Sequence, residues 1–234
     1  MMIDIENLTK VYGKQTVLNI QELKIGKGES FGLVGNNGAG KTTMFRCILD
    51  LVRPNTGFVL SKNNNVASTE SWKYYTGSYL DEGFLIDFLT PEEYFRFVAD
   101  VYKLSEGDLE TFYREFEDFF NNEILGKHKL IRTLSSGNRQ KIGIAAALMP
   151  NPEVLVLDEP FNNLDPSTQI RLKKILKSWQ KEREITMLIS SHDLNHITEV
   201  CNRVVVLHEG IIVHDLMTTP DTLQVLEEYF AVKG

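Results

Sequence analysis

Apolar and polar residues alternate at the start of the chain. Met2–Leu8 and Val17–Ile25 both show this alternation, and the turn Tyr12-Gly13-Lys14 lies between them. A period of two residues is typical of a strand with one face buried and the other in water. The two segments therefore predict an N-terminal antiparallel sheet.

Later segments are apolar without interruption. Val154–Leu157 and Thr186–Ile189 have this character, which suits parallel strands buried on both faces. Helical patterns alternate with these segments, so the sequence predicts an α/β core. The predicted strands are Glu29–Val34, Thr76–Leu80, Val154–Leu157, Glu184–Ile189 and Arg203–Leu207, and the predicted helices are Lys41–Leu51, Ser167–Arg183 and Leu194–Val200.

The segment from Thr90 to about Pro150 has a different character, because its pattern is helical and rich in aromatic residues. Thr90-Pro91-Glu92-Glu93 predicts a helix start, with Thr as the N-cap, Pro at the first position and Glu completing a capping box. We therefore expect one domain over 1–234, in which an α/β core of 1–82 and 151–234 is interrupted by a helical lobe at about 83–150.

The charge balance, the cysteine content and the lengths of the apolar runs exclude several classes of protein. The 234 residues include 25 basic and 32 acidic side chains, for a net charge of −7. This balance lacks the basic footprint of a nucleic-acid-binding protein, so no nucleic-acid partner is expected, although a local basic patch stays possible. Two cysteines, Cys47 and Cys201, do not suggest a disulfide framework, and with no signal-like N-terminus a cytoplasmic location is the default. The longest apolar run, Ile142–Met149, is too short to cross a bilayer.

A phosphate-binding loop follows the predicted strand Glu29–Val34. Residues 35–42 fit the pattern Gly-x-x-x-x-Gly-Lys-Thr, in which glycines let consecutive backbone N–H groups curl around phosphates at a helix N-terminus. Lys41 would supply a positive charge to the β and γ phosphates, and the Thr42 hydroxyl could ligate Mg²⁺. The predicted nucleotide-binding residues here are Gly35, Asn36, Asn37, Gly38, Ala39, Gly40, Lys41, Thr42 and Thr43.

Two carboxylates close the strand Val154–Leu157. Asp158 could face the phosphate loop and hold Mg²⁺ through water, and Glu159 is placed to orient and polarise an attacking water. The plainer alternative is a strand that ends in a solvated acidic turn. We expect Thr42 and Asp158 to be metal ligands, and Glu159 to be catalytic together with Lys41.

Leu134-Ser135-Ser136-Gly137-Asn138, which lies between these two motifs, resembles the signature of ABC transporter ATP-binding subunits, usually written LSGGQ. By themselves the five residues would also fit a serine-rich helix cap. The resemblance covers nearly the whole chain and implies the ABC form of the P-loop fold, with ATP and Mg²⁺ as cofactors. It further implies that Ser135, Ser136 and Gly137, at the start of a helix over Asn138–Leu148, contact the γ-phosphate of ATP held by the opposite subunit. Ser136 and Asn138 depart from the commonest Gly and Gln.

Further positions are assigned by the same resemblance. His192, in Ser190-Ser191-His192-Asp193, matches the family's switch histidine and would contact the γ-phosphate, although alone it would fit a helix cap or a surface residue. Asp165 matches the loop that communicates across the dimer, and by itself is an N-cap. Tyr12 matches the aromatic that stacks on adenine, and its alternative is an ordinary aromatic at a strand end.

The loop that joins the core to the helical lobe departs from the family pattern, which usually has a glutamine there. We place Glu82 at that position, where a carboxylate could still ligate Mg²⁺, with Asp81 as the neighbouring candidate. Phe84 and Phe88, beside Glu82, are the residues we expect to contact membrane partners.

The resemblance implies a subunit that hydrolyses ATP to power transport. Its partners would be integral-membrane permease subunits and a second ATP-binding subunit, as a homodimer or heterodimer, and it would lie on the inner face of the cell membrane. The segments 88–94 and 226–230 are similar to bacterial exporters of drugs, peptides or lipids. The alternative is a non-transport ABC ATPase acting on ribosomes or DNA. One cassette and the short span between the phosphate loop and the signature disfavour it.

Overall fold

The N-terminal alternation forms an antiparallel sheet, which confirms the prediction. In the computed structural model, which describes residues 1–233, β1 (Ile3–Tyr12) pairs with both β2 (Gln15–Ile25) and β4 (Thr56–Ser61), and β5 (Asn64–Asn65) extends the sheet beside β4. The strand β4 was not predicted, because its first half is exposed and lacks an apolar pattern.

The second sheet is the core of the fold. Its order is β10-β9-β3-β8-β7-β6, in which β10 is antiparallel to β9 and the other neighbours are parallel. The strands are β3 (Ser30–Val34), β6 (Thr76–Tyr79), β7 (Val154–Leu157), β8 (Thr186–Ser191), β9 (Arg203–His208) and β10 (Ile211–Met217). The strand β10 was not predicted, since it lies at the edge of the sheet and is half exposed.

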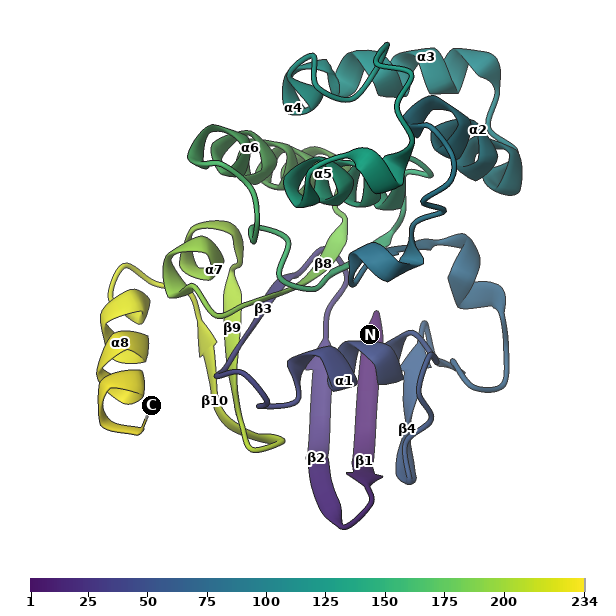
Figure 1. The fold of residues 1–234 in the computed structure, drawn as a ribbon. Coiled ribbons are helices and arrows are strands. Elements are labelled where there is room, and N and C mark those ends of the chain that lie inside the picture. The colour runs from purple at the N-terminus through teal and green to yellow at the C-terminus, as the bar shows by residue number, and fades with distance from the viewer. Residues whose placement is uncertain (234) are drawn as a thin grey trace.

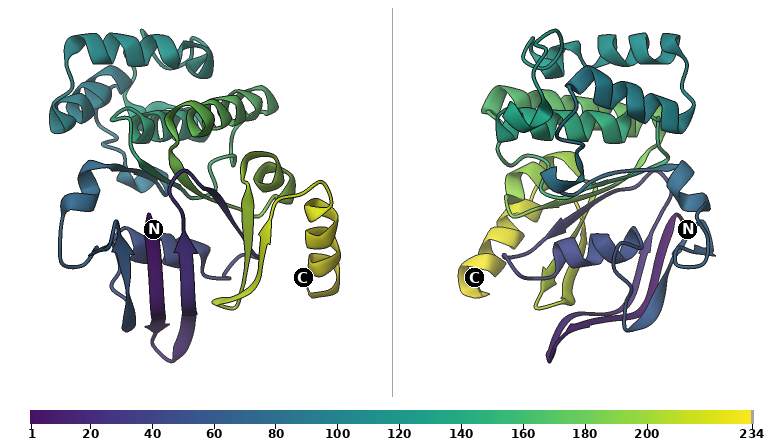
Figure 2. Two further views of the ribbon diagram at one scale, coloured as in Figure 1. Left: turned by 180° about the vertical axis from the view of Figure 1, so that it is seen from behind. Right: turned by 45° about the vertical axis from the view of Figure 1, so that its right-hand side comes forward.

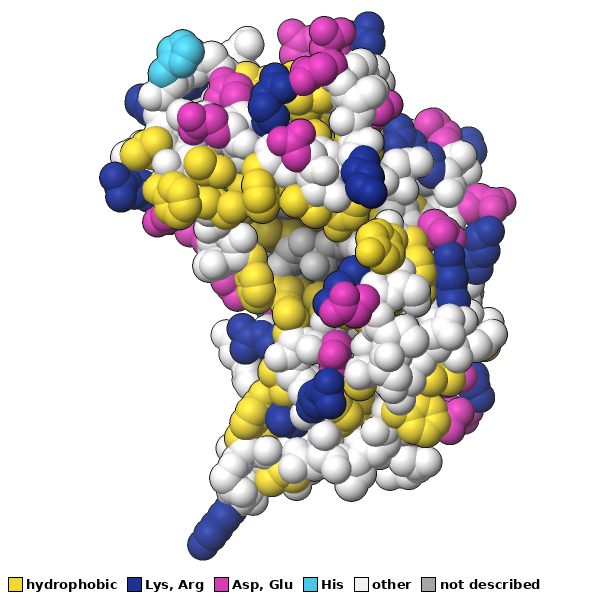
Figure 3. Space-filling view, turned by 90° about the vertical axis from the view of Figure 1, so that its right-hand side faces the viewer, with side chains coloured by type: hydrophobic (Ala, Val, Ile, Leu, Met, Phe, Trp, Pro, Cys, Tyr) yellow, Lys and Arg dark blue, Asp and Glu magenta, His cyan; other side chains and the backbone are white. Residues whose placement is uncertain are grey.

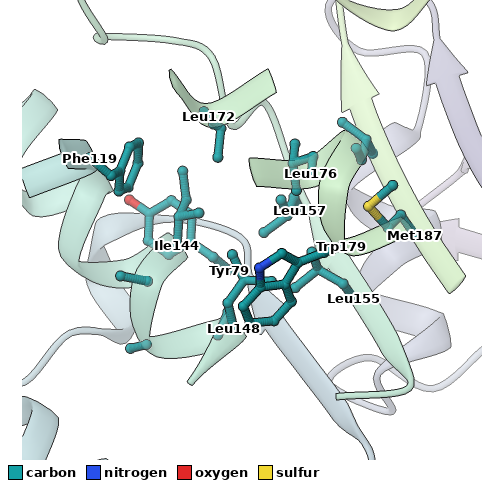
Figure 4. Close-up of a cluster of buried hydrophobic side chains, with 14 of the residues drawn as sticks. Tyr79, Phe119, Ile144, Leu148, Leu155, Leu157, Leu172, Leu176, Trp179 and Met187 are labelled. Atoms are coloured by element: carbon teal, nitrogen blue, oxygen red, sulfur yellow. The ribbon is translucent and has the colours of Figure 1, made fainter. Parts of the chain in front are cut away.

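Both faces of the middle of this sheet are covered, which explains why β7 is apolar without interruption. On one face, Val154 and Val156 of β7 pack in a cluster with Phe45 of α1 (Lys41–Ile48), so that α1 lies between the two sheets (Figure 1). On the other face, Leu155 and Leu157 pack with the helices α5 (Ser136–Leu148), α6 (Pro166–Arg183) and α7 (Leu194–Val200), as Figure 4 shows for α5 and α6.

The aromatic segment forms the helical insertion. Its helices are α2 (Pro91–Tyr102), α3 (Glu106–Glu115) and α4 (Glu117–Phe120), which lie beyond α5 and α6 at one end of the molecule (Figure 2). Thr90 and Glu93 form the predicted capping box. Most of the aromatic side chains are core, as Phe95 and Phe112 illustrate with ring centroids 5.0 Å apart. The short 3₁₀ helices η1 (Ser71–Tyr74), η2 (Glu82–Phe84) and η3 (Ile131–Thr133) lie in the connections, and α8 (Thr222–Lys233) packs against α7.

The sheet order brings the predicted motifs to one edge. The phosphate loop follows β3, Asp158 follows β7, and His192 follows β8. These three strands are consecutive neighbours and parallel, so their carboxyl ends meet. Among residues 1–233, no helix combines the length and the apolar character that crossing a bilayer would require.

Candidate nucleotide-binding and catalytic site

The phosphate loop is a tight turn between β3 and α1. Gly40 has a φ of 108°, and a Cβ there would lie 2.8 Å from the backbone oxygen of Val17, so the position requires glycine. The Lys41 side chain, only 7% exposed, starts α1 and donates to the backbone oxygen of Gly35 at 2.6 Å. The loop therefore holds a buried positive charge at a helix N-terminus, where phosphate is favoured.

Asp158 lies beside the first turn of α1. Its carboxylate accepts hydrogen bonds from the Thr42 hydroxyl at 2.5 Å and from the Ser190 hydroxyl, and the residue is 6% exposed. Burial raises the pKa of Asp158, and the nearby Glu159 charge adds to the rise, while the two hydroxyl donors oppose it. A buried carboxylate next to a hydroxyl supplies the oxygen ligands that Mg²⁺ prefers, so these residues fit the metal.

Glu159, His192 and Lys41 converge from three different elements. Glu159 Oε1 lies 3.5 Å from Lys41 Nζ, and Glu159 Oε2 lies 2.9 Å from His192 Nδ1. The backbone N–H of His192 also donates to Oε2, at 3.2 Å. The structure thus places all three predicted catalytic side chains in one cluster next to the phosphate loop, where an acceptor for a water proton is needed.

The segment Leu134–Gly137 leads directly into α5. Ser135 is the N-cap, and its hydroxyl accepts from the backbone N–H of Asn138 at 3.2 Å. The helix consequently begins at Ser136, so the start predicted at Asn138 was wrong by two residues. The cavity lined by residues 36–43, Val17 and Glu159 does not include Ser135, Ser136 or Gly137.

The loop before the helical insertion places two carboxylates near the site. Asp81 caps η2, because its side chain accepts from the Gly83 N–H at 2.8 Å. Glu82 is paired with Arg139 of α5, at 2.6 Å between Oε2 and Nε. Both acidic residues line a cavity that Asp158 and Glu159 also line, so the geometry is compatible with either as the replacement for the usual glutamine.

Two predicted residues lie in other settings. Tyr12 ends β1, is 47% exposed, and has Lys10 Nζ 5.0 Å from its ring centroid. Asp165 is the N-cap of α6, and its carboxylate accepts from the side chains of Ser167 and Thr168 at 2.6 Å each. Those hydrogen bonds, that of Ser167 first, hold the pKa of Asp165 well below its usual range.

A cavity beside the phosphate loop is lined partly by residues that the sequence did not single out. It has a volume of about 630 Å³ and is lined by Asn36–Ala39 together with Gln15, Thr16, Val17, His208 and Glu209. The residues of β2 and of the β9–β10 turn come together only in the fold, and they carry no local pattern. Ser190 was also missed as a partner of Asp158, although it lies two residues before His192.

An exposed apolar surface adjoins the loop at Glu82. Phe84 is 53% exposed and Phe88 is 64% exposed. Figure 3 shows that hydrophobic side chains gather in a band across the middle of the face on the side of α2. Large exposed apolar side chains such as Phe84 and Phe88 are typical of a surface that binds another protein.

Comparisons with known proteins identify the family of this chain. Residues 18–162 match the family described as ABC transporter. The chain is 36% identical to the bacitracin transport ATP-binding protein BcrA of Enterococcus faecalis, over 92% of this chain and 69% of that protein. It is 32% identical to the lantibiotic transport ATP-binding protein SrtF of Streptococcus pyogenes, over 98% and 96%.

Among solved structures, the dimeric structure of MJ0796, a bacterial ABC transporter cassette, superimposes with a TM-score of 0.80 at 26% identity, covering 93% of this chain and 99% of that one. The chain therefore belongs to the ABC transporter family and is an ATP-binding subunit with ATPase activity. The predicted fold, an α/β core with an N-terminal antiparallel sheet and a helical insertion, is confirmed.

Proposed function

We propose that this subunit closes with a second ATP-binding subunit around ATP, and that this closure drives export through membrane-spanning partners. The observation that carries the proposal is the cluster of Lys41, Glu159 and His192 beside the phosphate loop. The cluster provides a positive charge, a proton acceptor and a partner for that acceptor. Such a set suits the attack of water on a terminal phosphate.

Within the site, each side chain has a separate role. The loop N–H groups and Lys41 bind and orient the phosphates, while Glu159 holds the attacking water and His192 contacts the γ-phosphate. Thr42 and Asp158 would hold Mg²⁺, with Glu82 or Asp81 as a further ligand, and the ion would neutralise charge between the phosphates. Tyr12 stacks on adenine in this proposal, and the exposure of its ring supports that role.

The second subunit completes the site. Ser135, Ser136 and Gly137 of one subunit contact the γ-phosphate bound by the other, and Asp165 lies in the loop that joins the two sites. The position of Ser135, exposed at the N-terminus of α5, supports this role because helix N-termini favour anions. Closure by ATP and opening after phosphate release is a switch between two states whose contacts with nucleotide differ. The dimeric form of the MJ0796 cassette supports the arrangement.

The membrane partners would bind near Glu82. Phe84 and Phe88 project from the loop that links the catalytic core to the helical insertion, so a permease bound there would sense the state of the site. The subunit would then lie on the inner face of the membrane. The names of the bacitracin and lantibiotic transport proteins support export of a peptide or a similar compound.

Co-expression with membrane-spanning subunits of the expected type provides the test, and genes adjacent to that of this chain are the place to look for them. Co-expressed with them, the tagged subunit is expected to sediment with membranes, and the double variant Phe84→Asp/Phe88→Asp is expected to lose this association while keeping its ATPase activity. Val232→Asp is a matched control, because Val232 is 83% exposed on α8. Sedimentation with ribosomes or binding to DNA would overturn the proposal. A neighbouring gene for an extracytoplasmic binding protein would indicate import in place of export.

A further inference from the structure

The first turn of α5 is attached to the loop that carries Glu159. The side-chain amide of Gln140 donates to the backbone oxygen of Glu159 at 3.1 Å, and Gln140 is only 4% exposed. On the same turn, a Cβ on Gly137 would lie 2.5 Å from the backbone oxygen of Asn163. The helix that begins with the signature segment is thus in direct contact with both ends of the 159–163 loop.

Glu159 has a backbone conformation that depends on its neighbours. Its φ is 49°, in the left-handed region that side chains other than glycine seldom adopt. Its N–H donates to the Ser190 hydroxyl at 2.9 Å, and its oxygen accepts from Gln140 and from the Asn162 N–H. A strained residue keeps such a conformation only where its surroundings fix it, and a strained residue at a catalytic position points to a functional constraint.

The neighbouring residue on α5 makes a parallel link. Arg139 Nε binds the Glu82 carboxylate at 2.6 Å, and its Nη1 donates to the backbone oxygen of Leu134 at 2.6 Å. Consecutive residues of one helical turn therefore reach both the loop at Glu82 and the loop at Glu159. A shift of this turn would displace both loops together.

We propose that Gln140 is a positioning residue for Glu159. By holding the backbone oxygen of Glu159 it fixes the left-handed conformation, and this conformation directs the carboxylate towards Lys41 and His192. The positioning itself is a property of one subunit. The coupling between the two ATP sites that follows from it rests on the proposed function, in which the signature segment of the same helix contacts ATP bound by the partner. Occupation of one site would then set the geometry of the general base in the other.

Gln169 offers a matched control. Its side-chain amide donates to the backbone oxygen of Phe161 at 3.0 Å, so it anchors the same loop two residues further on. Gln140→Met and Gln169→Met each remove one side-chain donor to a backbone oxygen and keep a side chain of similar length. If Gln140 positions Glu159, only the first change should slow hydrolysis.

The experiment compares ATPase kinetics of the two variants with the unmodified protein in Mg²⁺. We expect Gln140→Met to lower kcat about tenfold, the effect of losing about 1.4 kcal/mol of transition-state stabilisation, with KM and the thermal midpoint close to those of Gln169→Met. If Gln140→Met folds poorly, Gln140→Glu can replace it. The glutamate keeps the shape of the side chain but lacks the N–H donor when ionised, so kcat should fall in the same way. Equal kcat values for the Gln140 and Gln169 variants would overturn the proposal.

A double variant separates positioning from a general structural effect. In a Glu159→Gln background, single-turnover hydrolysis should not fall further when Gln140→Met is added, because the group that Gln140 positions is already missing. An additive, tenfold further loss would contradict the proposal. Failure of Glu159→Gln to dimerise with ATP would instead contradict the proposed function and leave the positioning of Glu159 to be decided by the kinetics.

Discussion

Replacing Lys41 by alanine tests the phosphate site most simply. The ammonium group is buried, lies 2.6 Å from the Gly35 oxygen, and faces the Glu159 carboxylate at 3.5 Å. A hydrogen bond from a charged donor to phosphate contributes about 2 kcal/mol net, which corresponds to about a thirtyfold change in Kd. Without the lysine, Glu159 would also face the phosphates with no positive charge between them, so the loss should be at least this large.

The assay is calorimetric titration with ATP in the presence of a chelator, so that hydrolysis does not disturb the measurement. Lys173→Ala is the control, since Lys173 pairs with Glu199 at 2.7 Å on helices α6 and α7. Neither residue of that pair lines the cavities beside the phosphate loop, so the control should keep the ATP affinity of the unmodified protein. An unchanged Kd for Lys41→Ala would refute the role given to Lys41.

Two further predictions concern groups outside the catalytic cluster. Burial raises the pKa of Cys47 to about 11 and raises that of Cys201 as well, so neither thiol should react with an aromatic disulfide reagent at pH 8 until the protein is unfolded; a fast-reacting thiol in the native protein would contradict this. Asp165→Ala should cost about 1 kcal/mol of unfolding free energy at pH 7 through the lost N-cap. Because the pKa of Asp165 is lower in the folded than in the unfolded state, this contribution is present above about pH 4 and is lost as the pH falls below it. Urea unfolding at pH 7 and pH 3 checks this. If the unfolding free energies of the unmodified protein and of Asp165→Ala differ as much at pH 3 as at pH 7, the prediction is wrong.

Local signals were sufficient for much of the fold and for the phosphate loop. Gly40 and Lys41 belong to a short motif, and the residues of that motif alone determine its turn and its charge. The strand β7 was predictable because all of its residues are apolar. The strands β4 and β10 were missed because each lies partly exposed, β10 at the sheet edge and β4 next to the short β5 at the end of its sheet. An exposed strand needs no regular apolar pattern.

The connections within the site could not be predicted for a different reason. The pairing of Glu82 with Arg139, and the hydrogen bond from Gln140 to Glu159, join residues that are far apart in the sequence. Glutamate, arginine and glutamine are also common residue types on helices and loops, so their presence gives no local signal of these contacts. The helix start at Ser136 follows from the N-cap role of Ser135, which the sequence allowed as an alternative to phosphate contact.

The association state of Glu159→Gln with ATP tests the central claim, that the signature segment of one subunit completes the ATP site of another. The substitution keeps the shape of the side chain but removes its charge next to Lys41 and His192, so that ATP binds and is hydrolysed much more slowly than by the unmodified protein. Light scattering coupled to size exclusion should then give twice the monomer mass with saturating ATP and the monomer mass without nucleotide. A variant that binds ATP yet stays monomeric, at concentrations that support association, would contradict the account.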